Sequence, residues 1–311
     1  MDAITLSHAI DGYLLYAAGR QLSENTLRDY CTTFRRFREF LPDDPPMEQI
    51  SLGTIEAFFA GLNGLSRKTA LNYHTGLSAL WTWAVGRGVA TEHVLHQFTR
   101  PKPNQNVIEI FTEEQVQRLL DACKRTPAYS RPGKARCSNA RPTALRDKAI
   151  ILTLLDSMVR ASELSGMRRS DMSLKEGRIK VLGKGAKERW VPISSETAGA
   201  IWQYLAARPQ AKPQYDDMVF LTQRLRPMDR QAVLKVLDRL GQRVEVPTHP
   251  HKFRHTGATM FLRNGGNVFA LKEILGHSTM TMVQRYVHLA EVDIQEAHRR
   301  ASPVYNWDLR V

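Results

Sequence analysis

The feature that most limits how this chain can fold is a short polar segment with two prolines, about a third of the way along the sequence. Residues 99–106 read Thr-Arg-Pro-Lys-Pro-Asn-Gln-Asn. Proline fixes φ and removes a backbone donor, so this segment suits an extended connector. The 311 residues are enough for two hydrophobic cores. We therefore expect a domain at residues 1–98, a linker at 99–109 and a second domain at 110–311.

Charge is divided unevenly between these two parts. The chain carries 44 Lys and Arg against 31 Asp and Glu, a formal net charge of +13. Residues 1–100 hold 9 basic and 10 acidic side chains, so the remainder holds 35 and 21 and a net charge of +14. The basic excess indicates an anionic partner for the second domain, most simply nucleic acid.

Cysteine usage and hydropathy exclude several other classes of protein. The three cysteines are widely spaced and form no C-x-x-C pair, which fits a reducing compartment without a disulfide framework. No basic segment followed by an apolar run opens the chain, so we expect no secretory signal. The most apolar stretch, residues 149–159, is too short to span a bilayer. The sequence predicts a cytoplasmic protein with no membrane association.

The first domain is predicted to be helical throughout. Apolar residues recur at spacings of three and four, as in Tyr30, Phe34, Phe37 and Leu41, and prolines after residue 41 end that pattern. Four helices are expected, at residues 6–18, 23–40, 51–60 and 66–85.

The second domain is predicted to be mixed, with helices and one small β-hairpin. Thr112 and Gln115 have the spacing of a capping box that opens a helix. A further helix is expected over residues 144–159. Residues 178–182 and 188–193 have strand character and flank Gly-Lys-Gly-Ala at 183–186, which predicts a hairpin. Helices are expected from there to about residue 300, so the fold class is mainly α with a small sheet.

Six side chains in this basic domain suggest chemistry on a phosphodiester. Guanidinium groups match phosphate oxygens, imidazoles exchange protons near neutral pH, and a phenol can act as a nucleophile. No cluster of carboxylates suited to a metal accompanies them in the sequence. The set therefore indicates attack by a protein nucleophile, with fixed cations in place of a metal ion. Its members are Arg160, Lys184, His251, Arg254, His277 and Tyr286.

The order and spacing of these residues resemble the tyrosine recombinases, also called phage integrases. Their pattern is an Arg, a Lys in a hairpin, His-x-x-Arg, Leu-Gly-His and a Tyr nine residues later. Here His251 and Arg254 give the third motif, and Leu275-Gly276-His277 is followed by Tyr286. The layout is closest to that of the Xer recombinases and of compact transposon or phage integrases, with no additional arm-binding module expected.

The resemblance assigns each residue a role. Arg160 and Arg254 would hold the phosphate oxygens, and Tyr286 would form a 3′-phosphotyrosyl link that leaves a free 5′-hydroxyl. Lys184, with Lys187 as its rival, would give a proton to the leaving oxygen. His251 would act as a base or proton relay near Tyr286, and His277 would donate to a phosphate oxygen. Glu163, an acidic residue three positions after Arg160, would orient a catalytic group without reacting.

The resemblance also implies an architecture and a set of partners. A SAM-like helical core-binding domain and the catalytic domain would form a C-shaped clamp on double-stranded DNA. Four protomers would act on two recombination sites through a Holliday junction, with no metal, cofactor or ATP. The C-terminal tail of one protomer would pack on the next through Val304, Tyr305, Trp307 and Leu309.

Three other functions fit parts of the same pattern. A type IB topoisomerase shares the chemistry, and a non-catalytic DNA-binding protein could share the fold. A metal hydrolase would use His249, His251 and His255, although the Glu of H-E-x-x-H is missing. Two features depart from the family: Met158 replaces the usual Gly before the first Arg, and residues 127–142 form a long basic segment that would add a DNA contact or a loop.

Overall fold

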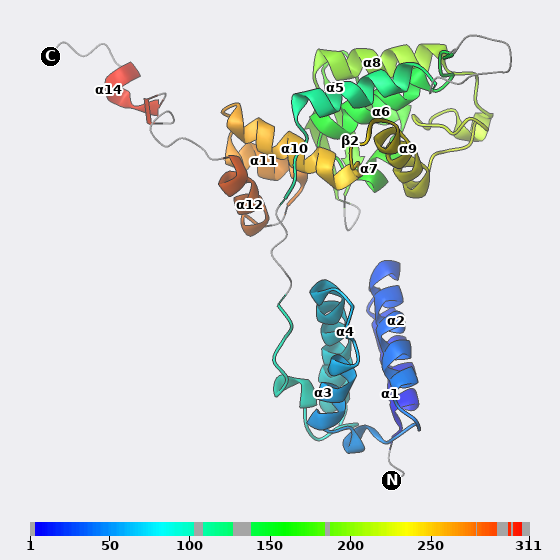
Figure 1. The fold of residues 1–311 in the computed structure, drawn as a ribbon, viewed down its shortest axis with the longest axis vertical. Coiled ribbons are helices and arrows are strands. Elements are labelled where there is room, and N and C mark those ends of the chain that lie inside the picture. Colours follow the sequence, from blue (N-terminus) through cyan, green and yellow to red (C-terminus); the bar gives the residue numbers. More distant parts are fainter. Residues whose placement is uncertain are drawn as a thin grey trace. The chain divides into compact units, whose positions relative to one another are not determined.

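The computed structural model divides the chain into two compact units, residues 1–106 and 107–311. It describes residues 4–102, 108–126, 138–183, 187–277, 279–290, 298–299 and 301–306. Each unit is considered by itself (Figure 1). Residues 127–137, the centre of the basic segment in the sequence, lie outside the described part.

The first unit is helical in the part that the structure describes, as predicted. Its α-helices begin where the sequence offers a hydroxyl cap: the side chains of Thr5, Ser23, Ser51 and Ser66 each accept a hydrogen bond from a backbone N–H three residues on. The elements are α1 (Leu6–Gly19), α2 (Glu24–Phe40), η1 (Met47–Gln49), α3 (Leu52–Ala60), α4 (Arg67–Gly86) and η2 (Val94–His96).

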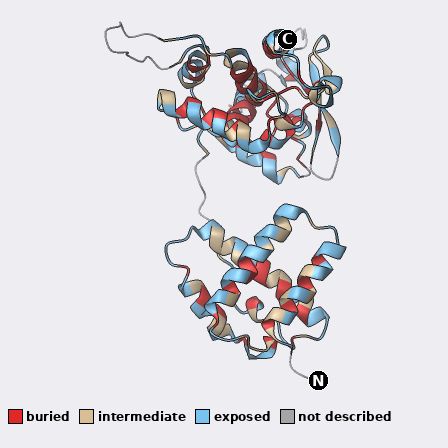
Figure 2. Ribbon diagram, turned by 90° about the vertical axis from the view of Figure 1, so that its right-hand side faces the viewer, coloured by how far each residue is buried: buried red, intermediate tan, exposed pale blue. Residues whose placement is uncertain are grey.

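Aromatic side chains form the centre of the first unit's core. The ring of Phe37 lies edge-on to Phe58, 5.0 Å between centroids, and 6.0 Å from Trp81. All three side chains are almost fully buried. Figure 2 shows the buried positions facing the interior of the unit. These edge-to-face contacts stabilise the core in addition to the burial of its apolar surface.

The second unit is mainly helical with one small sheet, which confirms the expected fold class. The predicted capping box is present, with Thr112 and Gln115 each bonding the other's backbone N–H. The elements are α5 (Glu113–Lys124), α6 (Ala144–Asp156), α7 (Ala161–Ser165), η3 (Arg169–Asp171), β1 (Met172–Ser173), β2 (Arg178–Leu182), β3 (Glu188–Pro192), α8 (Ser195–Ala207), η5 (Pro213–Tyr215), α9 (Arg230–Val244), α10 (Pro250–Arg263), α11 (Val268–Leu275), α12 (Thr281–Ala290) and α14 (Pro303–Asn306).

The sheet has three antiparallel strands in the order β1-β2-β3. Lys180 pairs with Trp190 and Leu182 with Glu188 across the predicted hairpin. The two-residue strand β1 was not expected, because it is too short to give an alternating pattern. Gly183 N–H donates to the carbonyl oxygen of Lys187 and closes the ladder at 2.8 Å.

Helix α10 packs against α6, α11 and α12 within the core of the second unit (Figure 1). Gly257 allows the close approach to α6, since a Cβ there would lie 2.2 Å from the carbonyl oxygen of Leu155. This helix carries the His-x-x-Arg motif of the sequence. Burial of α10 therefore brings that motif next to the segments that carry Arg160, His277 and Tyr286.

Helix α6 ends at Asp156, three residues earlier than predicted. The cause is Met158, whose φ of +55° belongs to the left-handed region. A non-glycine residue there costs about 1–2 kcal/mol. The position where the family usually has Gly thus keeps a glycine-like backbone although its side chain is a buried methionine.

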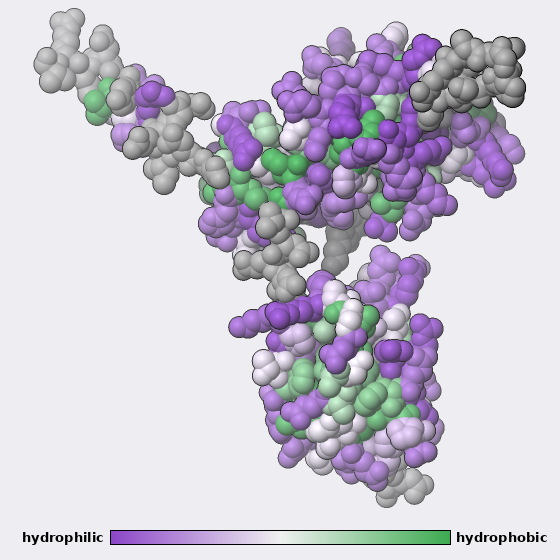
Figure 3. All heavy atoms as spheres, in the orientation of Figure 1, coloured by the Kyte–Doolittle hydropathy of each residue, from purple (hydrophilic) through white to green (hydrophobic). Residues whose placement is uncertain are grey.

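Among the described residues, no helix is both long and apolar enough to cross a bilayer. Hydrophilic residues cover most of the face of the second unit that Figure 3 shows. In the tail, Val304 is exposed. Trp307, Leu309 and the side chain of Tyr305 lie outside the described part of the chain.

We expect Phe37→Ala to lower the free energy of unfolding of the first unit by about 3–5 kcal/mol, because it leaves a cavity between Phe58 and Trp81. The matched control is Phe40→Ala on the same helix, where the ring is 41% exposed and the loss should be clearly smaller. Hydrogen exchange of α2 and α4 peptides in the full chain measures both. Equal protection losses would contradict the packing described.

Candidate active site

Five of the six predicted residues lie in the described structure and come from four segments. Arg160 is the N-cap of α7, His251 and Arg254 lie on α10, His277 follows α11, and Tyr286 lies on α12. The sixth, Lys184, lies outside the described residues, between the ends of β2 and β3.

Arg254 lies at the centre of this arrangement and is 3% exposed. Its Nη1 donates to the carbonyl oxygen of Met158 at 2.7 Å, and its Nη2 donates to that of Leu275 at 2.7 Å. These two carbonyls immediately precede the segments that carry Arg160 and His277. The guanidinium therefore ties three catalytic motifs together through backbone atoms. Burial, with help from Arg160, lowers the pKa of Arg254 to about 10, so it remains charged at neutral pH.

The left-handed backbone of Met158 helps to aim its carbonyl at Arg254. Gly276, with φ of +63°, similarly ends α11 directly after Leu275. Each carbonyl that accepts from Arg254 therefore belongs to a residue with positive φ or to the residue directly before one. Sequence reasoning identified the missing Gly as a departure from the family and could not tell that the conformation persists.

His277 accepts a hydrogen bond from Arg254. Its Nε2 lies 3.0 Å from Nη2 of Arg254, and because a guanidinium can only donate, this nitrogen must be the acceptor. The ring proton of His277 is then on Nδ1, which is buried and has no partner in the part of the chain that the structure describes. Burial, with Arg254 and Arg160 nearby, lowers the pKa of His277 to about 4.

Tyr286 is 4% exposed and shares a hydrogen bond with His255, with 3.0 Å between Oη and Nδ1. The motif in the sequence predicts His251 near the phenol and indicates His255 only as part of a metal site. Both histidines are on α10 one turn apart, and their ring centroids are 6.3 Å apart. The i, i+4 spacing in His-Lys-Phe-Arg-His was the signal that could have marked His255 as a second candidate.

The surroundings of His255 disfavour its charged form. Burial first, then His251 and Arg285, lowers the pKa of His255 to about 4, which keeps the ring neutral at pH 7. Burial raises the pKa of Tyr286 above its ordinary value, while Arg254 and Arg285 oppose that rise. The phenol therefore stays protonated in this state, next to a neutral imidazole.

Glu163 connects Arg160 to a residue that sequence reasoning missed. Its buried carboxylate accepts from the backbone N–H and Nη1 of Arg160 at 2.8 and 2.9 Å. It also accepts from Nη1 and Nη2 of Arg189 on β3, at 2.9 and 3.0 Å. Burial would raise the pKa of Glu163, but the hydrogen bonds from Arg189 and Arg160 bring it below its ordinary value.

No group of three or more His, Cys, Asp or Glu able to hold a metal is found among the described residues. Of the three histidines considered for a metal site, His249 caps α10 through Nδ1 and His255 bonds Tyr286. These nitrogens are already engaged in hydrogen bonds.

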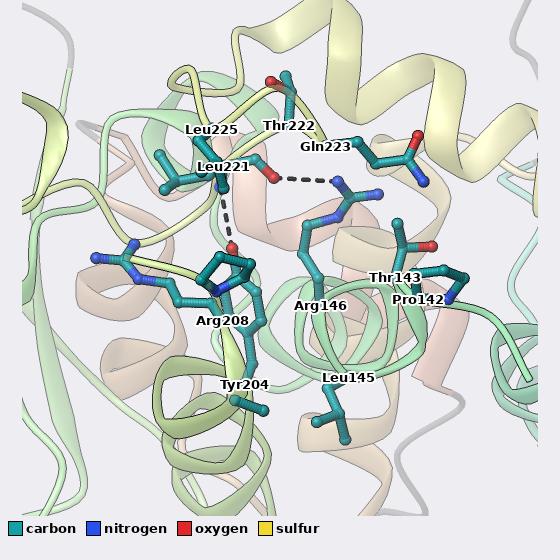
Figure 4. A pocket seen from close by; sticks show the side chains of 12 residues that line it. Pro142, Thr143, Leu145, Arg146, Tyr204, Arg208, Leu221, Thr222, Gln223 and Leu225 are labelled. Carbon is teal, nitrogen blue, oxygen red and sulfur yellow. Dashed lines mark hydrogen bonds between the residues drawn. The ribbon is translucent and has the colours of Figure 1, made fainter. Parts of the chain in front are cut away.

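A separate pocket lies between α6, α8 and the loop after residue 220, and none of the site residues lines it (Figure 4). Its polar groups bond one another: Arg146 donates to the carbonyl oxygen of Leu221, and Leu221 N–H donates to Oη of Tyr204. The candidate site is therefore the cluster around Arg254.

A helical unit followed by a mixed unit with this cluster defines a class of DNA strand-transfer protein, and comparison with known proteins agrees. Residues 109–292 match the phage integrase family, and residues 10–91 match the N-terminal SAM-like domain of phage integrases. The chain belongs to the phage integrase family, the tyrosine-type site-specific recombinases.

Similar proteins are named as Xer recombinases. Tyrosine recombinase XerC of Corynebacterium efficiens is 29% identical over 295 residues, which cover 94% of this chain and 89% of that protein. Tyrosine recombinase XerD of Listeria monocytogenes serotype 4b is 27% identical over 295 residues, which cover 91% of this chain and 94% of that protein. The similarity thus extends over both units.

Solved structures share the fold. The Tn1549 transposon integrase in complex with a circular intermediate DNA matches with a TM-score of 0.73 and 22% identity, over 89% of this chain and 94% of that one. A lambda integrase tetramer bound to a Holliday junction matches with a TM-score of 0.71 and 19% identity, over 92% and 78%.

We expect Glu163→Gln to lower the free energy of unfolding of the second unit by about 3 kcal/mol, because one amide cannot satisfy both the largely buried guanidinium of Arg189 and the partly buried one of Arg160. The control is Glu273→Gln, whose carboxylate is exposed and lies 3.7 Å from Lys272, and which should change stability by less than about 0.5 kcal/mol. Urea unfolding, with hydrogen exchange of peptides from α7 as the readout, measures the difference in the free energy of unfolding. Similar values for the two variants would contradict the role of Glu163.

The ring of His255 should titrate at about 4 instead of its ordinary 6.5. Because the folded-state pKa is the lower one, the stability contributed by the neutral ring is present above pH 6.5 and is lost as pH falls towards 4. NMR titration of ring-labelled histidine measures the pKa. Tyr286→Phe should leave it low, since burial is its main cause, and a midpoint near 6.5 would contradict the description.

Proposed function

We propose that this tyrosine recombinase cuts and rejoins double-stranded DNA at specific sites through a 3′-phosphotyrosyl intermediate on Tyr286. The observation that carries the proposal is the bond between the Tyr286 phenol and the neutral imidazole of His255, beside the buried charge of Arg254. A phenol with a raised pKa needs both a base and nearby cations to become a nucleophile.

The proton of Tyr286 passes to Nδ1 of His255 as Oη attacks phosphorus. His255 can accept it because its ring is neutral at pH 7. His251 is exposed and one turn away on the same helix, so it relays the proton to solvent or to DNA. The P–O bond to the 5′-oxygen breaks, and the new phosphotyrosine keeps the bond energy for the reverse reaction.

Arg160 and Arg254 hold the non-bridging oxygens as charge develops on them. In the state described, Arg254 donates to His277. His277 can donate to phosphate from Nε2 only after that bond breaks and the ring proton moves from Nδ1. DNA binding therefore separates this pair and turns both groups towards the phosphate.

Lys184 gives its proton to the leaving 5′-oxygen in this scheme. The support is its place in the hairpin sequence, since β2 ends before it at Leu182 and β3 begins after it at Glu188. The free 5′-hydroxyl of a second strand then attacks the phosphotyrosine and joins the new ends. No metal ion, cofactor or ATP takes part.

At the level of the whole protein, the first unit and the catalytic unit clamp opposite sides of the duplex. Four protomers bind two sites and pass through a Holliday junction, a proposal supported by the fold that this chain shares with a tetrameric integrase. The tail residues Val304, Tyr305, Trp307 and Leu309 pack on the neighbouring protomer. The protein acts in the cytoplasm.

Tyr286→Phe should abolish the covalent protein–DNA complex on a nicked suicide substrate that carries the protein's site, in the presence of EDTA, while DNA binding persists. Tyr215→Phe, in η5, is the control and should form the complex like wild type. His255→Ala should slow formation by about 10²–10⁴-fold and His251→Ala by less. A complex that survives in Tyr286→Phe would contradict the proposal.

A further inference from the structure

Arg189 on β3 lies among three segments that carry catalytic groups, and it has no role in the mechanism above. Besides its two bonds to Glu163, its Nε donates to the carbonyl oxygen of Ile274 at 2.9 Å, near the end of α11. Its side chain is 13% exposed. One guanidinium thus links β3 to α7 and α11 with three hydrogen bonds.

Two glycines lie against this guanidinium. A Cβ on Gly183, at the end of β2, would lie 3.3 Å from Nη1 of Arg189, and a Cβ on Gly276 would lie 3.1 Å from its Nε and Cζ. Gly183 immediately precedes Lys184 in the chain, and Gly276 immediately precedes His277. Larger residues at either place would displace the guanidinium or the backbone.

We propose that Arg189 is a positioning residue for the cleavage step. It holds the base of the β2–β3 hairpin, the segment that carries Lys184, in place relative to Arg160 and His277. The inference rests on the proposed function. The planar fork is needed because the same group must meet both carboxylate oxygens and a carbonyl oxygen in different directions. A lysine has the charge but cannot make all three bonds with fixed geometry.

The proposal predicts a chemical signature, because a misplaced general acid matters only when the leaving group needs a proton. Replacing the 5′-bridging oxygen at the scissile phosphate with sulfur gives a leaving group that departs as a thiolate. Arg189→Lys should slow covalent-complex formation on ordinary DNA by about 100-fold. On the sulfur substrate, it should come within about ten-fold of wild type.

The matched control is Arg208→Lys. The Arg208 side chain is similarly buried and donates to the carbonyl oxygens of Met218, Val219 and Asp216, none of which adjoins a site residue. It should lose stability and cleave both substrates with the same relative rate as wild type. Lys184→Ala, run alongside, should show the same rescue by sulfur as Arg189→Lys.

Equal losses on the two substrates, or no loss on ordinary DNA, would overturn the proposal. If Arg189→Lys does not fold, Gly183→Ala replaces it, since the added methyl would lie 3.2 Å from the carbonyl oxygen of Lys187 and 3.3 Å from Nη1 of Arg189, and so would disturb the base of the hairpin while the buried charges stay in place. The same rescue is expected. Wild type that forms no covalent complex would instead refute the proposed function, so the two failures are distinguishable.

Discussion

The structure of the site depends on one buried cation, the guanidinium of Arg254. Taking this charge out of water is costly unless every donor finds a partner, and the carbonyl oxygens of Met158 and Leu275 supply two of them. The first carbonyl belongs to Met158, which is itself left-handed, and the second belongs to Leu275, which precedes the left-handed Gly276. The cost of burying Arg254 is thereby offset by bonds that also bring Arg160, His277 and the α10 helix into one cluster.

A second buried group, the carboxylate of Glu163, completes the arrangement with the opposite charge. It balances Arg160 and Arg189 and connects the sheet to α7. The protein thus places Arg160, Arg189, Arg254 and His277 close together, and each of these side chains makes at least one hydrogen bond. A phosphate that enters this cluster would meet cations that are already held close together, and the bond between Arg254 and His277 would then be exchanged for bonds to the phosphate oxygens.

Much of the fold follows from local sequence. Hydroxyl caps at Ser23, Ser51 and Ser66 and the capping box at Thr112 mark helix starts, and the glycines at 183 and 185 mark the hairpin. What the sequence could not supply are contacts between distant segments. The bond of His255 to Tyr286 spans 31 residues and that of Arg189 to Ile274 spans 85; neither leaves a local pattern. The left-handed conformation of Met158 could not be predicted from the residue itself, since methionine rarely adopts it; the only indication is the Gly that the family usually has there.

The proposed mechanism requires that Tyr286 itself becomes bonded to DNA. The most direct test is to trap the complex on a suicide substrate, digest protein and DNA, and sequence the adduct peptide by mass spectrometry. The expected product is a nucleotide joined through its 3′-phosphate to Tyr286, in the peptide that spans α12. An adduct on any other residue, or only non-covalent DNA binding, would contradict it.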